Sequence, residues 1–200
     1  MLLTAIFLIL VNCAAIVKEL PVIPLLTGVV VLAYLLIFHV DWVMYLMAFL
    51  TPLSIVLEFK DYKLGLSFPG EIVMIAVTFL FLCRLLYDLS MDRKLLRHPV
   101  AIALCVYLGW MLLTCITSEI PMVSFKFWLS KIWFTTSSYW MVIQLIKDDY
   151  RNLVRYFNCY AVALAIVVLI TTYKHALSGF DEKYGHWVMD PFYNDHTAYG

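Results

Sequence analysis

Long runs of apolar residues separated by short polar connectors extend along this chain from its start to about residue 173. A helix needs roughly 20 apolar residues to cross a bilayer, and about seven runs approach that length. Helix is expected in each run, because a segment in lipid must satisfy every backbone N–H and C=O internally. The predicted fold is therefore all-α, a polytopic transmembrane helical bundle with spans at 2–17, 21–38, 40–57, 69–87, 99–117, 129–146 and 155–173.

Proline and polar residues mark the boundaries between these runs. Pro52, in "LTPLS", is expected to kink the third span near its end, and Pro99 is expected to begin the fifth. The connector "FHVDW" is so short that the second and third spans are predicted to form a tight antiparallel pair. The stretch "EFKDYKLGLS" is predicted to be a loop, and residues 174–200 an external polar segment.

The composition supports lipid as the solvent for most side chains. Hydrophobic residues make up 64% of the 200 residues and charged residues 14%, against about 25% charged residues in ordinary globular proteins. The net charge is zero, so no nucleic-acid partner is indicated. The five cysteines lie in hydrophobic runs without C-x-x-C spacing, which argues against zinc or redox chemistry. The first run lacks a basic start and a cleavage site, and is interpreted as a retained helix.

The basic residues near the span ends predict the orientation of the bundle. All the arginines lie at the connectors after the fourth and sixth spans, whereas the opposite side carries scattered lysines among acidic residues. We therefore expect the N-terminus and those two connectors on the cytoplasmic side. The outer face then holds residues 58–68, 118–128 and 174–200.

A polar stripe crosses the sixth span and the residues before it. On a helix, Ser124, Lys131, Thr135 and Ser138 fall within about 60° of one another, while Lys126 points roughly the opposite way. A lysine at the bilayer centre costs about 2.5–3.5 kcal/mol. Two interpretations remain open for Lys131: it binds an anionic head group such as a lipid pyrophosphate, or it snorkels to the outer interface. Lys126 is interpreted as an interface anchor.

The last residues, "DPFYNDHTAYG", are unlike the rest of the chain because they are polar. Histidines and acids recur from residue 174 onward, but their spacing matches no familiar ligand pattern, so no metal site is predicted. Asn194 or Asp195 is instead suited to capping a further helix that begins near His196.

Four stretches of the sequence carry a resemblance to a known family. "TPLSI" (51–55), "SFPGE" (67–71), "SFKFWLSKIWF" (124–134) and "PFYNDHTAYG" (191–200) occur in this order. Together they resemble segments of the O-antigen ligase and O-antigen polymerase membrane family, particularly its Bacteroidetes-type members. Members of that family are longer than this chain, so the resemblance implies that the chain is the N-terminal portion of a larger bundle.

The resemblance implies an activity and a place for it. Such proteins are multi-pass glycosyltransferases of the bacterial inner membrane that act in polysaccharide and lipopolysaccharide biosynthesis. They transfer a glycan from undecaprenyl pyrophosphate, on the outer face, to another glycan or to a lipid-A core, without a cofactor or an obligatory metal. By this resemblance Lys131, with Ser124, Thr135 and Ser138, would bind the substrate, and Asp195 and His196 would lie near the acceptor as catalytic residues.

Two alternatives belong to other functional classes. A transporter-like component of polysaccharide export would predict broken helices at matched positions in two halves, which Pro52 alone does not supply. A non-catalytic membrane scaffold would not need the polar stripe or the polar tail.

Overall fold

The computed structural model describes residues 12–13, 18, 22–59, 64–87, 97–185 and 187–193. The described chain is mostly helical, which confirms the all-helical prediction in its main part. The chain divides into two compact units, Met1–Val43 and Met44–Gly200. Almost all of the predicted first span lies outside the described residues.

The first unit contains helix α2 (Val22–Phe38), which closely matches the range predicted for the second span. Many of its apolar side chains are exposed, including those of Val22 and Phe38. His39 alone separates α2 from α3 (Val40–Leu53), and its carbonyl accepts the N–H of Trp42.

The prediction of a helix over 40–57 followed by a loop is wrong in its second half. Helix α3 ends at Leu53, and the chain then forms an antiparallel hairpin of β1 (Ile55–Phe59) and β2 (Leu64–Phe68). Pro52 lies in the last turn of α3, and the Ser54 hydroxyl donates to the Leu50 carbonyl at 2.8 Å. A proline disfavours continuation of the helix, and pairing between the strands satisfies the backbone groups that the helix no longer uses.

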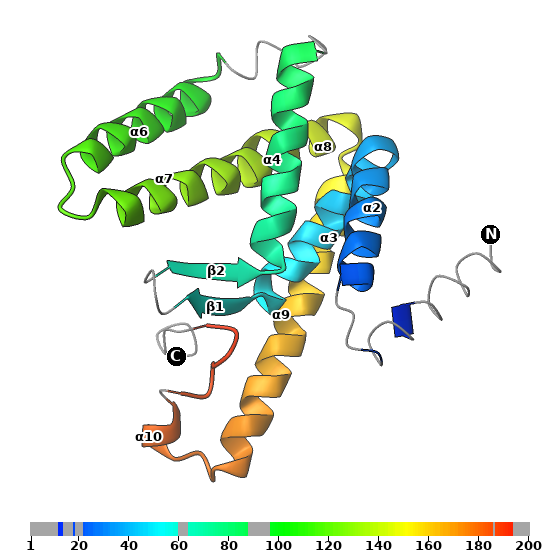
Figure 1. The fold of residues 1–200 in the computed structure, drawn as a ribbon. Helices are drawn as coiled ribbons and strands as arrows, with labels where there is room; N and C mark the ends of the chain where they lie inside the picture. Colours follow the sequence, from blue (N-terminus) through cyan, green and yellow to red (C-terminus); the bar gives the residue numbers. More distant parts are fainter. Residues whose placement is uncertain are drawn as a thin grey trace. The chain divides into compact units, whose positions relative to one another are not determined.

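Helix α4 (Gly70–Tyr87) follows the hairpin, and α6 (Pro99–Ile116) begins where Pro99 predicts. Beyond a turn, α7 (Pro121–Thr135) lies beside α6, as Figure 1 shows. The π-helical segment η1 (Thr136–Met141) and α8 (Val142–Asp148) come next. The longest helix is α9 (Arg151–Leu177), and the short α10 (Glu182–Gly185) leads to the turns at 187–192.

The predicted span at 129–146 and the residues before it, from Pro121 onward, form one helical run in the structure. The junction residues Thr136 and Met141 keep helical dihedral angles, so α7, η1 and α8 are continuous. A π segment widens the turn and leaves carbonyls in need of donors. The Trp133 carbonyl accepts the Ser137 hydroxyl at 2.7 Å and the Thr78 hydroxyl of α4 at 3.4 Å.

Among the described residues, α6 and α9 are long and apolar enough to cross a membrane. In each, only 11% of the most apolar window is buried inside the molecule. Helices α2 and α3 are apolar but shorter. Two candidate membrane helices are therefore present, and the bundle of seven spans stays a prediction.

The packed core of the second unit joins α3, α4 and η1. Phe81 of α4 stacks on Trp140 of η1, with ring centroids 5.6 Å apart. Asn152 is buried and connects three helices: it accepts the Tyr45 hydroxyl of α3 at 2.8 Å, and its amide nitrogen donates to the Leu145 carbonyl of α8 at 3.1 Å. The core also contains the buried side chains of Met44, Met47, Ala48, Val73, Val77, Met141 and Leu145.

Candidate functional site

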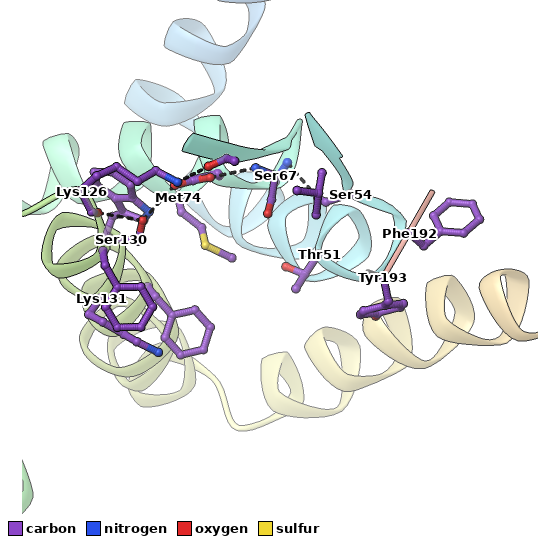
Figure 2. A pocket seen from close by; sticks show the side chains of 16 residues that line it. Thr51, Ser54, Ser67, Met74, Lys126, Ser130, Lys131, Phe192 and Tyr193 are labelled. Carbon is purple, nitrogen blue, oxygen red and sulfur yellow. Dashed lines mark hydrogen bonds between the residues drawn. The ribbon is translucent and has the colours of Figure 1, made fainter. Parts of the chain in front are cut away.

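A pocket of about 460 Å³ opens where the β hairpin meets α3, α4 and α7. Figure 2 shows Lys126, Ser130 and Lys131 on one side and Phe192 and Tyr193 at the other. The remaining lining residues are hydroxyl-bearing, small or apolar: Thr51, Ser54, Val56, Gly65, Ser67, Gly70, Glu71, Met74, Phe127, Trp133 and Phe134.

Glu71 holds together the three elements that form one wall of the pocket. Its side chain belongs to the first turn of α4 and is only 7% exposed. One carboxylate oxygen accepts the backbone N–H of Ser67 at the end of β2, at 2.9 Å, and the other accepts the Ser130 hydroxyl of α7 at 3.2 Å. The first contact is related to a capping box, in which an acid in the first helical turn satisfies an N–H just before the helix. Glu71 therefore couples the hairpin to α7.

Helices α3 and α4 also meet closely, through hydrogen bonds at Ser54 and Gly70. The Gly70 N–H donates to the Ser54 hydroxyl at 3.0 Å, and that hydroxyl donates onward to the Leu50 carbonyl. A Cβ atom at residue 70 would collide with the Ser54 hydroxyl oxygen. Any larger residue would displace the Ser54 hydroxyl from its two hydrogen bonds, so this close approach favours glycine and explains part of the "SFPGE" stretch in structural terms.

Two lysines reach the pocket from successive turns of α7. The Lys126 ammonium donates to the Gly65 carbonyl of β2. The Lys131 ammonium lies over the Phe127 ring, 5.1 Å from its centroid. Within the described part of the chain, no acidic side chain forms an ion pair with either lysine. The pocket thus presents two ammonium groups, neither in an ion pair with a described acid, beside the buried carboxylate of Glu71.

The aromatic end of the pocket comes from the segment after α10. Phe192 and Tyr193 are half-buried, and the Tyr193 N–H donates to the Met189 carbonyl at 3.1 Å. Burial raises the pKa of the Tyr193 phenol above its ordinary value of 10.0, and Tyr160 of α9 adds a smaller contribution in the same direction. This phenol therefore stays neutral, and it remains a hydrogen-bond donor over a wider pH range than an exposed tyrosine.

The predicted stripe on α7 reaches the pocket only in part. Lys131 lines the pocket, but the Ser124 hydroxyl lies 2.6 Å from the Ser118 hydroxyl instead. Thr135 and Ser138 are half-buried and are not among the lining residues. The wider turn of η1 changes the angular spacing after Thr135, so a stripe drawn at 100° per residue does not continue to Ser138.

Lys126 differs from its expected role. The sequence analysis directs it away from Lys131, as an interface anchor, yet both lysines line the same pocket. The reason is the hairpin, which extends the wall of the pocket over α7 so that side chains on two faces of that helix contribute. Asn194, Asp195 and His196 lie outside the described residues.

Sequence reasoning missed Glu71 and Ser130 as parts of the site. Glu71 has an ordinary explanation as a favourable charge at the start of a helix, and Ser130 is one of many hydroxyl-bearing residues in this part of the sequence. The available signal was Glu71 itself, an acid in the first turn of a predicted helix, which can accept a backbone N–H just before that helix.

Comparisons with known proteins identify no relative: no family model, no curated protein and no solved structure matches this chain. The geometry of the pocket is therefore the basis for a functional proposal.

Proposed function

We propose that this chain is, or is part of, an integral membrane glycosyltransferase of the bacterial inner membrane. It transfers or polymerises a glycan from undecaprenyl pyrophosphate on the outer face, and the pocket beside the hairpin holds the pyrophosphate. The observation that carries this proposal is the convergence of Lys126 and Lys131 on one pocket, where neither forms an ion pair with a described acid.

The origin of the lining residues supports an outer site. The segments expected outside are 58–68, 118–128 and 174–200, and each contributes to the pocket. Gly65 comes from the first, Lys126 from the second and Tyr193 from the third. Segments on one side of a membrane can form a common site, so this convergence is consistent with the predicted orientation.

The two lysines suit a pyrophosphate in number and in kind. An ammonium group has three donors, so Lys126 keeps two after its bond to Gly65. Lys131 has all three available, since its recorded contact is with the Phe127 ring. Fixed cations beside a departing pyrophosphate stabilise the negative charge that develops in the transition state.

The reaction can be written with its atoms in balance. The acceptor hydroxyl oxygen bonds to the anomeric carbon of the donor sugar, while the bond from that carbon to the pyrophosphate oxygen breaks. The lipid pyrophosphate leaves with the electron pair, and the acceptor proton passes to a base. The resemblance assigns that role to Asp195 or His196; among the described lining residues, Glu71 is the carboxylate, and it is engaged with Ser67 and Ser130.

The proposal is tested with the full-length protein in lipid nanodiscs. Binding of undecaprenyl pyrophosphate is compared with binding of undecaprenol, which has the same chain without phosphate. We expect Lys131→Ala to weaken binding of the pyrophosphate lipid about tenfold, which corresponds to roughly 1.4 kcal/mol, and to leave undecaprenol binding unchanged. Lys131→Arg should retain most of the affinity, and Lys183→Ala, at an exposed lysine of α10, is the matched control.

Equal affinity of wild type and Lys131→Ala for the pyrophosphate lipid, at equal folded protein, would refute the assignment of the pocket. Glycan chain length, followed by gel in cells carrying the same variants, tests the transferase. An unchanged glycan ladder combined with weaker lipid binding would instead favour a non-catalytic component of polysaccharide export.

A further inference from the structure

Large apolar side chains gather at the end of α9 and are turned toward the solvent. Leu177 is 71% exposed, Phe180 61%, Tyr184 59% and Trp187 76%. Three of them, Leu177, Tyr184 and Trp187, line one hollow of about 760 Å³. We name these four residues the aromatic patch. Such a patch on an ordinary monomer marks an interaction surface.

The backbone beside the patch adopts an unfavourable conformation. Gly179 and Phe180 both have positive φ angles, 70° and 57°. The Phe180 N–H donates to the His175 carbonyl at 3.0 Å, the bond that ends a helix in a Schellman motif. Glycine adopts such angles without strain, whereas phenylalanine does so at a cost. The Phe180 ring makes an edge-to-face contact with the His175 ring, with centroids 5.1 Å apart, which holds this side chain beside the end of α9.

The other side of the same segment is attached firmly to the protein. Val188 and Met189 are buried, directly after the exposed Trp187. The Lys174 ammonium of α9 donates to the Asp190 carbonyl at 2.8 Å. The segment is therefore a folded element with one attached side and one apolar exposed side.

The patch continues the exposed apolar surface of α9. Leu169 and Tyr173, in the last turns of that helix, are also mostly exposed. At 1.5 Å per residue, the 27 residues of α9 extend about 40 Å, more than the roughly 30 Å of bilayer hydrocarbon. The end of α9 with Lys174 and His175 therefore reaches the polar boundary of the membrane, where tryptophan and tyrosine are enriched.

We propose that the aromatic patch is an interfacial membrane anchor that lies in the phospholipid headgroup region beside the end of α9. The hollow matches that environment, because Lys174, Ser178 and Asp190 share its lining with Tyr184 and Trp187. Leu177, Phe180, Tyr184 and Trp187 then lie on the bilayer surface and are not free in water. The anchor also fixes the start of the segment that carries Phe192 and Tyr193 to the pocket.

Tryptophan depth in the full-length protein tests this anchor. The protein is placed in nanodiscs of phosphatidylcholine brominated either near the headgroup or near the chain end, and iodide is added as an aqueous quencher. Subtracting the emission of Trp187→Phe from that of wild type isolates Trp187. Trp110→Phe provides the depth reference, because Trp110 is similarly exposed but lies within α6.

We expect the Trp187 emission to be quenched at least twofold more strongly by the shallow bromines than by the deep ones, and the Trp110 emission to show the reverse order. Iodide quenching that exceeds lipid quenching would put Trp187 in water and overturn the anchor. Protection of Trp187 from all three quenchers would show that another part of the protein covers it. Stronger quenching by the deep bromines would show that Trp187 is inserted into the hydrocarbon. Either result also overturns the proposal.

Discussion

The two candidate membrane helices and the pocket region use their side chains in opposite ways. In α6 and α9, large apolar side chains are exposed along most of the length, although α6 also packs along α7. Around the pocket, a small number of polar groups join four elements through defined hydrogen bonds, with Glu71 and Ser54 at the junctions. The first region presents apolar surface of the kind that lipid covers, and the second depends on its own contacts.

This difference predicts which substitutions each region tolerates. A lipid-facing surface accepts any apolar residue, because lipid tails are as apolar as leucine. A buried polar junction accepts few changes, because a donor that loses its partner cannot turn to water. Substitutions in the two regions can therefore be compared directly.

The largest effect is expected for a charge on the exposed face of α6. Val106 is 66% exposed near the middle of this helix. Val106→Asp should cost about 3 kcal/mol of insertion free energy, because a charged side chain there meets hydrocarbon. The fraction of protein recovered in the membrane measures the effect, and Val106→Leu is the matched control. Normal recovery of Val106→Asp would show that this face of α6 meets water.

The next largest effect is expected at Glu71. Glu71→Ala leaves the Ser67 N–H without its acceptor and the Ser130 hydroxyl with the Lys126 carbonyl alone, at a cost of about 1.5–3 kcal/mol in the free energy of unfolding. Thermal stability in detergent, followed by size-exclusion chromatography, should fall clearly for this variant. Glu71→Gln should lose less, because its amide oxygen still accepts a bond. The exposed Glu182→Ala is the control, and equal stability of the two alanine variants would contradict the structural role of Glu71.

The smallest effect concerns the ionisation of Tyr193. Because the pKa of the Tyr193 phenol is raised in the folded protein, the phenol keeps its proton at a pH where the unfolded chain begins to lose it. The contribution of Tyr193 to the free energy of unfolding is therefore intact below pH 10 and declines as the pH rises above that value. Tyrosinate absorbance across an alkaline titration measures it. The difference between wild type and Tyr193→Phe should show a phenol that ionises later than an ordinary tyrosine, and a difference curve centred at 10.0 would contradict the burial.

The sequence predicted helices well wherever the apolar pattern was long and a start signal was present. Helix α6 begins at Pro99, and α4 begins within a residue of its predicted start. Such helices depend on local features, namely backbone bonds inside the segment and a proline or a turn at the end.

The hairpin could not be read from the same pattern. Residues 55–57 are apolar and continue the run of α3, so they resembled the end of a span. Their strand conformation depends on pairing with residues 66–68, which lie beyond a polar connector. Pairing between segments apart in the sequence is decided by tertiary contacts and not by local propensity.

The candidate site shows the same division. Lys131 was identified because a lysine in an apolar helix requires an explanation, and that argument is local. The lining of the pocket by Lys126, Glu71 and Tyr193 required the hairpin and the return of the chain after α10.

For this protein, the amino-acid sequence by itself determined the helical character and the apolar surfaces, because backbone hydrogen bonding and side-chain solvation act within each segment. The tertiary structure decided which polar groups meet. The bonds from Glu71 to Ser67 and Ser130 form only when β2, α4 and α7 come together, and no single segment specifies that arrangement.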